Sequence, residues 1–243
     1  MGRVIVAGAG RMTVPIAGIL ASDLAVGTVV KLMEGGAAVE YLVVNQGIPS
    51  NSDLYDASCN GTWLLRKDIH SERQWDGSSN LDKYEISDIN IWLNRNYFSS
   101  LGMVEQASIK QVKIPYRKGG GHGADQSGAN GLSTKIFLLS GYEVGWTNSD
   151  NQYFPVDGAK LSYFESGTGT SANSKRIANL NNSADRWWLR SPAINGTTTV
   201  WLVAEDGDYP GSFSSASDSR GIRPALIIPS TAKFDSTTLI LKG

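Results

Sequence analysis

The stretch "RWWLRSPAINGTTTVWLVAEDGDYPGSFSSASDSRGIRPALIIP", residues 186–229, decides the fold of this chain. Its two ends differ from its middle. Trp187, Trp188 and Leu189 are bulky apolar residues, and "GIRPALIIP" at 221–229 is a second apolar run. Short apolar runs bounded by proline, glycine or serine are typical of buried strands. We therefore predict two buried strands that hold a polar segment between them.

The segment between these strands is rich in Ser, Thr, Gly, Asn and Asp and carries isolated aromatic residues. Rigid aromatic side chains among small hydrogen-bonding residues are typical of antibody paratopes. We expect a ligand-binding surface here, formed by Asn195, Thr197, Thr199, Trp201, Glu205, Asp206, Asp208, Tyr209, Ser212, Phe213, Ser215, Ser217 and Asp218. Ordinary solvated turns are the alternative for the polar members, and a core position is the alternative for Trp201. Tyr209 and Phe213 are the preferred aromatic contacts, because neither belongs to an apolar run.

The rest of the chain predicts an α+β domain with short mixed or antiparallel sheets, one or two helices and long loops. Two apolar runs flank Gly35-Gly36, which indicates a β-hairpin. "ISDINIWLNRNYFSSL" at 86–101 has apolar residues at helical spacing, with Ser87 or Asp88 as its cap. We further expect strands at 62–69 and 112–116, a segment at 135–146 that starts as a core strand, a short helix at 103–111, and loops at 116–131 and 147–185. Loops of this length are often functional.

Composition excludes several classes of protein. The formal net charge is -1 and no run of Lys or Arg stands out, so a nucleic-acid partner is not expected. No apolar run approaches the length of a membrane-spanning helix. Cys59 is the only cysteine, so an intrachain disulfide is excluded. Cys59 with His70 or His122 would be a catalytic pair, but "DASCNGTW" carries no catalytic signature, and we expect a structural cysteine.

The N-terminal stretch "VIVAGAGRM", residues 4–12, suggests a dinucleotide-binding turn at Gly8 and Gly10, with Glu34 as the acidic residue that such a fold places about 20 positions on. That fold needs a helix after the turn, and Pro15 and Gly18 interrupt the segment concerned. Dinucleotide binding is therefore not expected. We predict that residues 1–25 form an arm for assembly or subunit contacts, and that residues 26–243 form the ligand-binding domain.

The pair "WWLRSP" and "GIRPAL" resembles the signature of a domain common in phages and prophages of gut Firmicutes. The upstream stretches "SCNGTWLLRKDI" and "GANGLSTKIFLLSGYEVG" resemble it too, so the resemblance covers about residues 25 to 230. It implies a C-type-lectin-like fold of the formylglycine-generating-enzyme type. It also implies that residues 187–192 and 221–226 frame the site and do not contact the ligand. Such proteins are similar to phage tail receptor-binding proteins and to the variable proteins of diversity-generating retroelements.

The sequence departs from the catalytic and calcium-binding branches of that fold. The Glu-Pro-Asn, Gln-Pro-Asp and Trp-Asn-Asp motifs of calcium-dependent lectins do not occur, so calcium-dependent sugar binding is not expected. "EDGD" at 205–208 offers carboxylates for a hard cation such as calcium, but a solvated turn is the favoured interpretation. Formylglycine-generating enzymes rely on cysteine chemistry, which Cys59 alone does not supply. No cofactor and no metal site are predicted.

The resemblance and the polar segment together predict a non-catalytic protein that recognises a bacterial host. It would bind a surface receptor, protein or glycan, from the tail tip of a virion made in the bacterial cytoplasm, or else act at the bacterial cell surface. Other tail subunits are expected partners, and a homotrimer is expected by analogy with tail proteins. Two alternatives stay open: a structural tail or baseplate protein, and a glycan-degrading tail enzyme.

Overall fold

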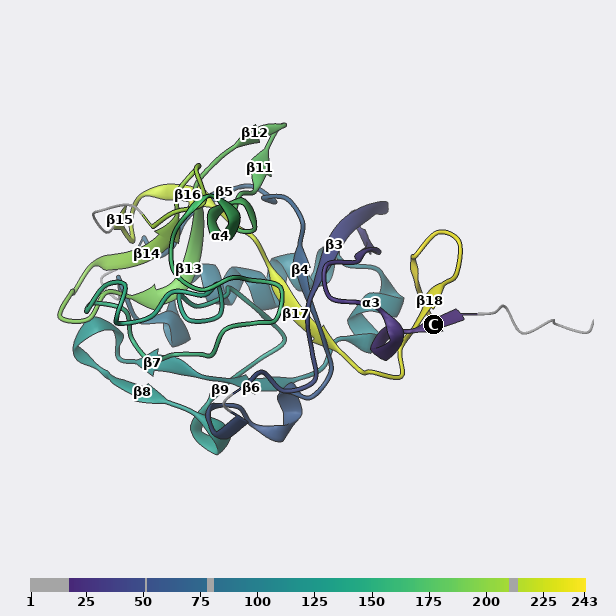
Figure 1. Cartoon of the computed structure of the whole chain (residues 1–243), viewed down its shortest axis with the longest axis horizontal. Helices are drawn as coiled ribbons and strands as arrows, with labels where there is room; N and C mark the ends of the chain where they lie inside the picture. Colours follow the sequence, from purple (N-terminus) through teal and green to yellow (C-terminus); the bar gives the residue numbers. More distant parts are fainter. Residues whose placement is uncertain (1–17, 51, 78–80, 210–213) are drawn as a thin grey trace, which may run out of the picture.

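The computed structural model describes residues 18–50, 52–77, 81–209 and 214–243 (Figure 1). These residues form a mixed α+β structure with many short strands, mostly antiparallel, and few helices, as the sequence predicts. Gly8 and Gly10, with the rest of residues 1–17, lie outside the described residues.

A five-stranded antiparallel sheet forms the centre, in the order β10-β17-β4-β3-β2. Its strands are β2 (Val29–Glu34), β3 (Ala37–Gln46), β4 (Thr62–Arg66), β10 (Ile136–Phe137) and β17 (Ala225–Ile228). Gly35 and Gly36 join β2 to β3 with φ of 58° and 83°. Two successive positive φ angles are those of the hairpin turn that matches strand twist, so the predicted β-hairpin is confirmed.

The central sheet is covered on both faces along β4, β17 and the second half of β3, which explains the continuous apolar runs of these segments. Along β3, Tyr41 and Val43 belong to one hydrophobic cluster, whereas Leu42 and Val44 belong to another. The same alternation divides the residues of β4 and β17 between the two clusters. Successive side chains of a strand point to opposite faces, so each face of the sheet lies against its own apolar layer.

A second five-stranded sheet has the order β15-β14-β13-β16-β5. Its strands are β5 (Glu72–Gln74), β13 (Trp187–Pro192), β14 (Thr199–Val203), β15 (Ser214–Ser215) and β16 (Ser219–Gly221). All six residues of β13 are buried, and so are all four of β17. The two predicted buried strands are therefore confirmed, and they lie in different sheets.

Small ribbons complete the sheet structure. They pair β1 (Gly18–Leu20) with β18 (Lys233–Asp235) and β18 with β19 (Leu241–Lys242), β6 (Val112–Ile114) with β9 (Leu132–Thr134), β7 (Tyr116–Lys118) with β8 (Ala124–Gln126), and β11 (Asn179–Leu180) with β12 (Ser183–Ala184). The β7–β8 ribbon lies within the predicted loop 116–131. Gly119 and Gly120, with φ of 82° and 76°, let the chain reverse between its strands.

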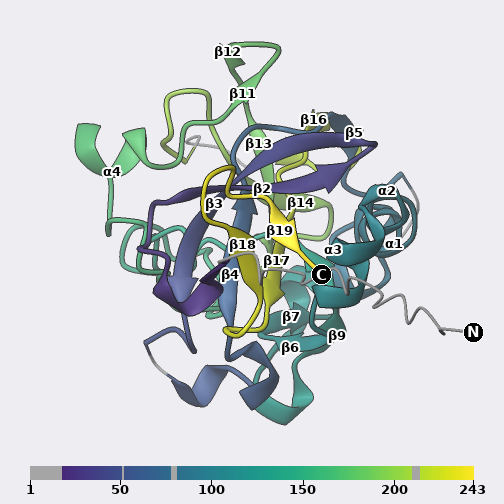
Figure 2. The same ribbon diagram turned by 90° about the vertical axis from the view of Figure 1, so that its right-hand side faces the viewer.

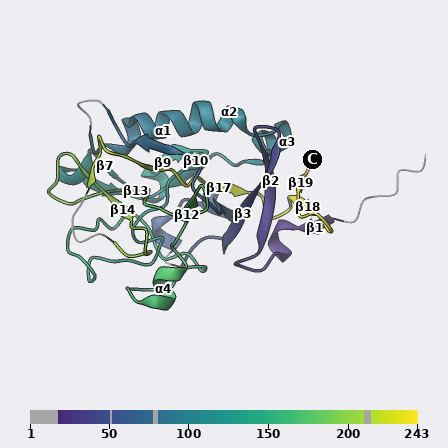
Figure 3. The same cartoon turned by 90° about the horizontal axis from the view of Figure 1, so that it is seen from above.

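The predicted helix at 86–101 is confirmed and contains a π-helical turn. It runs through α1 (Asp88–Trp92), the π-helical turn Leu93–Tyr97 and α2 (Phe98–Ser100) as one rod (Figure 3). The Ser87 hydroxyl caps it by accepting a 3.3 Å hydrogen bond from the Asn90 backbone N–H.

The remaining helices are short. α3 (Met103–Ser108) follows within the predicted 103–111 segment, and α4 (Thr170–Ser174) lies on the side of the molecule opposite to α1 and α2 (Figures 2 and 3). Short 3-10 turns occur at Ala21–Asp23, Ser52–Leu54, Ala57–Cys59, Tyr84–Ile86, Gly120–His122 and Gly128–Asn130. Across the described ranges, no helix is long and apolar enough to cross a membrane.

The predicted boundary at residue 25 lies inside the folded unit. β1 pairs with β18 near the other end of the chain, in the register Ile19 opposite Phe234. Ala21 and Leu24 are buried in the core, with exposed fractions of 0% and 6%. Residues 18–25 are therefore part of the domain, because their apolar side chains complete one of its hydrophobic layers.

Candidate functional site

The strand that leads into the polar segment is held by a buried arginine. Arg190 on β13 forms a bidentate ion pair with Glu143, at 2.6 and 2.7 Å, and both side chains are fully buried. Its other three N–H donors go to the carbonyl oxygens of Pro115, Leu138 and Asp157. All five guanidinium donors are thus satisfied. Burial lowers the pKa of Arg190 and is the largest single effect, but the charge and hydrogen bonds of Glu143, together with the charge of Asp157, raise that pKa above its usual value.

A second carboxyl group lies in the same buried cluster. Asp157 accepts a 2.7 Å hydrogen bond from the Ser191 hydroxyl through Oδ2. Its other oxygen, Oδ1, is buried and has no hydrogen-bond partner in the described part of the chain. Burial raises the pKa of Asp157 to about 7, although Arg190 and the Ser191 hydroxyl act in the opposite direction.

We predict that Asp157→Asn changes the pH dependence of stability. In the unfolded chain this carboxyl titrates near its ordinary pKa of 3.8, so the folded protein binds the proton more tightly. The free energy of unfolding of the wild type should fall by a few kcal/mol as the pH rises from about 4 to about 7. The variant keeps an oxygen acceptor for Ser191 and should lack this fall.

Urea unfolding at about pH 5 and about pH 8 measures this effect. The difference between the two proteins isolates Asp157, because His70, which titrates in the same range with a lowered pKa, is present in both. Parallel stability curves for the two proteins would show that Asp157 is not the titrating group.

An aromatic layer lies directly under the polar segment. Trp201 on β14 stacks on Phe154 with ring centroids 3.9 Å apart, and Tyr209 meets both rings edge-on. Trp201 is 1% exposed, and its Nε1 donates to the carbonyl oxygen of Tyr153. Trp201 is therefore a core residue beneath the surface, and its prediction as a ligand contact is wrong. "VWLVA" had left that alternative open, and the burial of its neighbours on β14 explains the outcome.

The predicted contact residues do not form one patch. β14 separates them, because one turn precedes this strand and another follows it. The four residue steps from Thr199 to Val203 span about 13 Å. Asn195, Thr197 and Thr199 lie at or before the start of β14, whereas Glu205, Asp206 and Asp208 lie beyond its end. The turns at the two ends therefore form separate surfaces.

We call the group at the start of β14 the serine–threonine face; it consists of Asn195, Thr197, Thr199, Ser215, Ser217 and Asp218. Thr199 pairs with Ser215 across the β14–β15 ladder, and the Thr198 carbonyl accepts from the Ala216 N–H. These contacts bring together two stretches that are separated in the sequence. Asp218 also forms an ion pair with Arg220 at 3.1 Å.

The group beyond the end of β14 borders a hollow. Asp206 and Asp208 line a cavity of about 510 Å³ together with residues from the loop and helix around α4, which we call the aspartate hollow. Its other lining residues are Thr168, Gly169, Thr170, Asn173, Ser174 and Ile177. Small hydroxyl, amide and carboxylate groups thus surround this space, with one isoleucine as an apolar contact.

The backbone of this turn is fixed by close packing. Gly207 has a φ of 81°, and a Cβ atom there would collide with the backbone carbonyl of Asn173 on α4. The Asp206 carboxylate accepts the Asp208 N–H at 3.0 Å, and the Asp208 carboxylate accepts the Tyr209 N–H at 2.8 Å. Each carboxylate uses one oxygen, Oδ1, to hold the turn in these two contacts.

The third carboxylate of "EDGD" has a different role. Glu205 forms a 2.7 Å ion pair with Arg186, and this hydrogen bond lowers the pKa of Glu205 to about 2. Glu205 does not line the aspartate hollow. Within residues 18–50, 52–77, 81–209 and 214–243, no group of three or more His, Cys, Asp or Glu side chains is arranged to hold a metal ion.

Three predicted contact residues remain: Tyr209, Ser212 and Phe213. Tyr209 is partly buried, and its hydroxyl donates to the Asp150 carbonyl at 3.1 Å. Ser212 and Phe213 lie outside the described residues.

Sequence reasoning missed the part of the aspartate hollow that residues 168–177 contribute. They lie within the long 147–185 loop, whose length was the only signal available. It also missed the glycine loop at 119–123, where the Gly121 carbonyl accepts the Asn195 N–H at 3.1 Å and fixes the start of the serine–threonine face.

Cys59, a candidate for catalysis, and Glu34, a candidate for nucleotide binding, both have structural surroundings. Cys59 is buried, its thiol donates to the Lys113 carbonyl, and burial raises the pKa of the thiol to about 12. A thiolate nucleophile is therefore strongly disfavoured at neutral pH. Glu34, once a candidate for a nucleotide ribose, ends β2 and accepts hydrogen bonds from Tyr41, Tyr97 and Arg66.

Comparison with known proteins places the chain in one domain family. Residues 60–230 match the family described as Domain of unknown function (DUF6273). No curated protein matches the chain, and no solved structure does. The matched segment begins just before β4 and ends just after β17, so it contains both buried strands, the serine–threonine face and the aspartate hollow. Because the match spans more than half of its length, the chain belongs to the DUF6273 domain family.

Proposed function

We propose that this chain is a non-catalytic ligand-binding protein that recognises a bacterial surface receptor, as part of a phage or prophage tail. In this proposal its fold is C-type-lectin-like, on the resemblance of the "WWLRSP" and "GIRPAL" pair. A variable protein of a diversity-generating retroelement, or a protein of the bacterial cell surface, would use the same binding chemistry. Neighbouring tail subunits and a homotrimeric assembly belong to the proposal by analogy with tail proteins.

The observation that carries this proposal is the aspartate hollow on a fixed turn. Its carboxylate, hydroxyl and amide groups are the kind that orient a polar ligand, and the packing of Gly207 against α4 holds them in place. Beneath the turn, the Trp201 and Phe154 rings stack in the core. A preorganised polar site needs little ordering on binding, and repetition of the site in a trimer would multiply a weak contact through avidity.

We expect Asp206→Asn combined with Asp208→Asn to weaken binding to host cells at least about tenfold, because two charge-assisted acceptors are removed. Asparagine keeps the oxygen that holds each N–H of the turn, so the fold should be retained. The measurement is retention of fluorescently labelled protein on intact cells of gut Firmicutes, followed by flow cytometry. Glu205→Gln is the matched control, since it removes a carboxylate of the same turn that does not line the hollow.

Three results would reject this function. They are a double variant that binds cells as well as the wild type, a wild type that binds none of the strains, and a Glu205→Gln protein that loses binding as strongly as the double variant. Absence of wild-type retention on every strain would favour a structural tail role. Release of soluble sugar from purified envelopes would favour the glycan-degrading alternative.

A further inference from the structure

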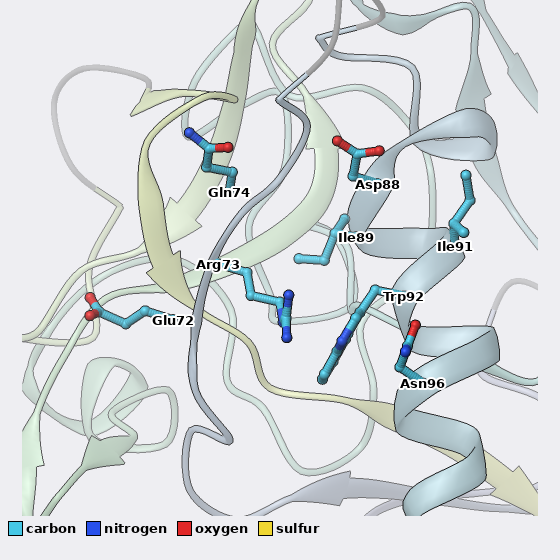
Figure 4. Close-up of a pocket in the computed structure, with 8 residues that line it drawn as sticks. All are labelled: Glu72, Arg73, Gln74, Asp88, Ile89, Ile91, Trp92 and Asn96. Carbon is cyan, nitrogen blue, oxygen red and sulfur yellow. The ribbon is translucent and has the colours of Figure 1, made fainter.

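A second hollow lies between the edge strand β5 and the helix α1 (Figure 4). The helix α1 lies on the side of the molecule opposite to α4 (Figure 3). The volume of the hollow is about 510 Å³, and its lining comes from two short segments: Glu72, Arg73, Gln74, Asp88, Ile89, Ile91, Trp92 and Asn96. None of the eleven predicted contact residues that the structure describes lines it. It is therefore a different site from the aspartate hollow.

Arg73 is the main charged group inside this hollow. Its guanidinium carbon lies 4.2 Å from the ring centroid of Trp92, as in a cation–π contact (Figure 4). Trp92 is in turn supported by Tyr97, at 5.8 Å between ring centroids, and by His70, at 5.4 Å. The guanidinium of an exposed arginine is thus held in place before any ligand arrives.

Among the described residues, the positive charge of Arg73 has no carboxylate partner. Ion pairs with acidic side chains are instead formed by Arg66, Arg117, Arg186, Arg190 and Arg220. Glu72 and Arg73 leave β5 in opposite directions, so the Glu72 carboxylate points away from the guanidinium (Figure 4). Asp88 accepts the Gly77 N–H at 3.0 Å. The N–H donors of the Arg73 guanidinium are therefore available to an acceptor on a ligand.

The remaining groups restrict the kind of anion. Glu72 and Asp88 at the rim repel ligands that carry several negative charges, which disfavours polyanions and phosphate dianions. The Gln74 and Asn96 amides can both donate and accept hydrogen bonds, as hydroxyl groups require. Ile91, 43% exposed, offers an apolar surface to the C–H groups of a ring.

We propose that this hollow binds one carboxylate carried by a hydroxylated ring, as in a uronic acid residue of a glycan. The carboxylate accepts two parallel hydrogen bonds from Arg73. The ring hydroxyls lie at Gln74 and Asn96, and the C–H face lies against Ile91. This site is independent of the aspartate hollow, so either site can fail its test without deciding the other.

The test is titration of the full chain with sodium D-glucuronate. Binding is monitored through the chemical shift of the Arg73 Nε–H group in nitrogen-15 NMR spectra. We expect saturable binding that weakens as salt is added, and D-glucose should bind at least about tenfold more weakly. Arg73→Gln should lose glucuronate binding by a similar factor, measured calorimetrically. Arg95→Gln is the matched control. Arg95 is an exposed arginine on the helical rod that contains Trp92, and its side chain lines a neighbouring hollow.

Each alternative ligand gives a distinct contrary result. Glucose that binds as tightly as glucuronate would remove the role of the carboxylate. N-acetylglycine that binds as tightly as glucuronate would remove the sugar assignment, because it carries a carboxylate without a hydroxylated ring. Tighter binding of inorganic phosphate would contradict the selection against multiple charges, and equal losses in the Arg73 and Arg95 variants would indicate a general charge effect.

Discussion

Replacing Arg190 with methionine should cost about 3–5 kcal/mol of stability, the usual result of removing one partner from a buried ion pair. Methionine fills much of the space of the arginine stem but leaves Glu143 buried without its counter-charge. It also removes the hydrogen bonds to the carbonyls of Pro115, Leu138 and Asp157. Equilibrium urea unfolding measures the loss.

A double variant distinguishes the charge effect from a packing effect. Arg190→Met with Glu143→Gln removes both charges. The amide oxygen of glutamine can accept from the Ser140 N–H, and its NH2 group can donate to the oxygen of the Tyr55 hydroxyl, which now donates to Glu143. The double variant should be more stable than Arg190→Met alone, because the uncompensated buried charge is gone. Equal or lower stability of the double variant would mean that lost packing and carbonyl contacts, not the charge of Glu143, account for the cost.

The local elements of this fold are predictable because their signals lie within a few residues of one another. The Gly35-Gly36 hairpin needs only two glycines between apolar runs, and the Ser87 cap needs only the helix that follows. The burial of β13 and β17 likewise follows from short apolar runs with fixed ends. Such patterns are read from neighbouring residues alone.

The partners of Arg190 were not predictable for the opposite reason. The arginine is visible in "WWLRSP", but its acceptors come from three other segments, including Glu143, 47 residues earlier in the chain. No spacing rule links these residues, since the contacts exist only after the central and second sheets have packed together. The sequence alone thus identifies a buried strand and leaves its polar partners undetermined.

The candidate site was predictable only as a segment, not as a surface. Composition selected residues 195–218 for their small polar side chains, but it contains no information on which of them lie together. The β14 strand places two groups of them at opposite ends, and residues 168–177 supply most of the lining of the aspartate hollow. A loop without periodicity gives no indication of where in the fold it will pack.

Trp201→Ala should destabilise the protein by about 3–5 kcal/mol, as truncation of a buried aromatic residue to alanine usually does. The ring is 1% exposed and stacks on Phe154 at 3.9 Å, so the variant leaves a cavity that its packed neighbours cannot fill completely. It also removes the hydrogen bond from Nε1 to the Tyr153 carbonyl. Tyr209 meets the same ring edge-on, so the turn that carries Asp206 and Asp208 loses part of its support.

The Trp201→Phe variant tests whether Trp201 supports the binding surface from the core or contacts the ligand itself. Phenylalanine keeps a ring against Phe154 and loses the N–H donor, so we expect a smaller loss of stability, about 1–2 kcal/mol. Because Trp201 is buried, this variant should bind host cells as the wild type does when both proteins are fully folded. If Trp201→Phe loses cell binding at nearly unchanged stability, Trp201 is a ligand contact. In that case the core around Phe154 has to open when the ligand binds. Urea unfolding and the cell-retention measurement on the same preparation therefore decide between a supporting and a contacting role for this tryptophan.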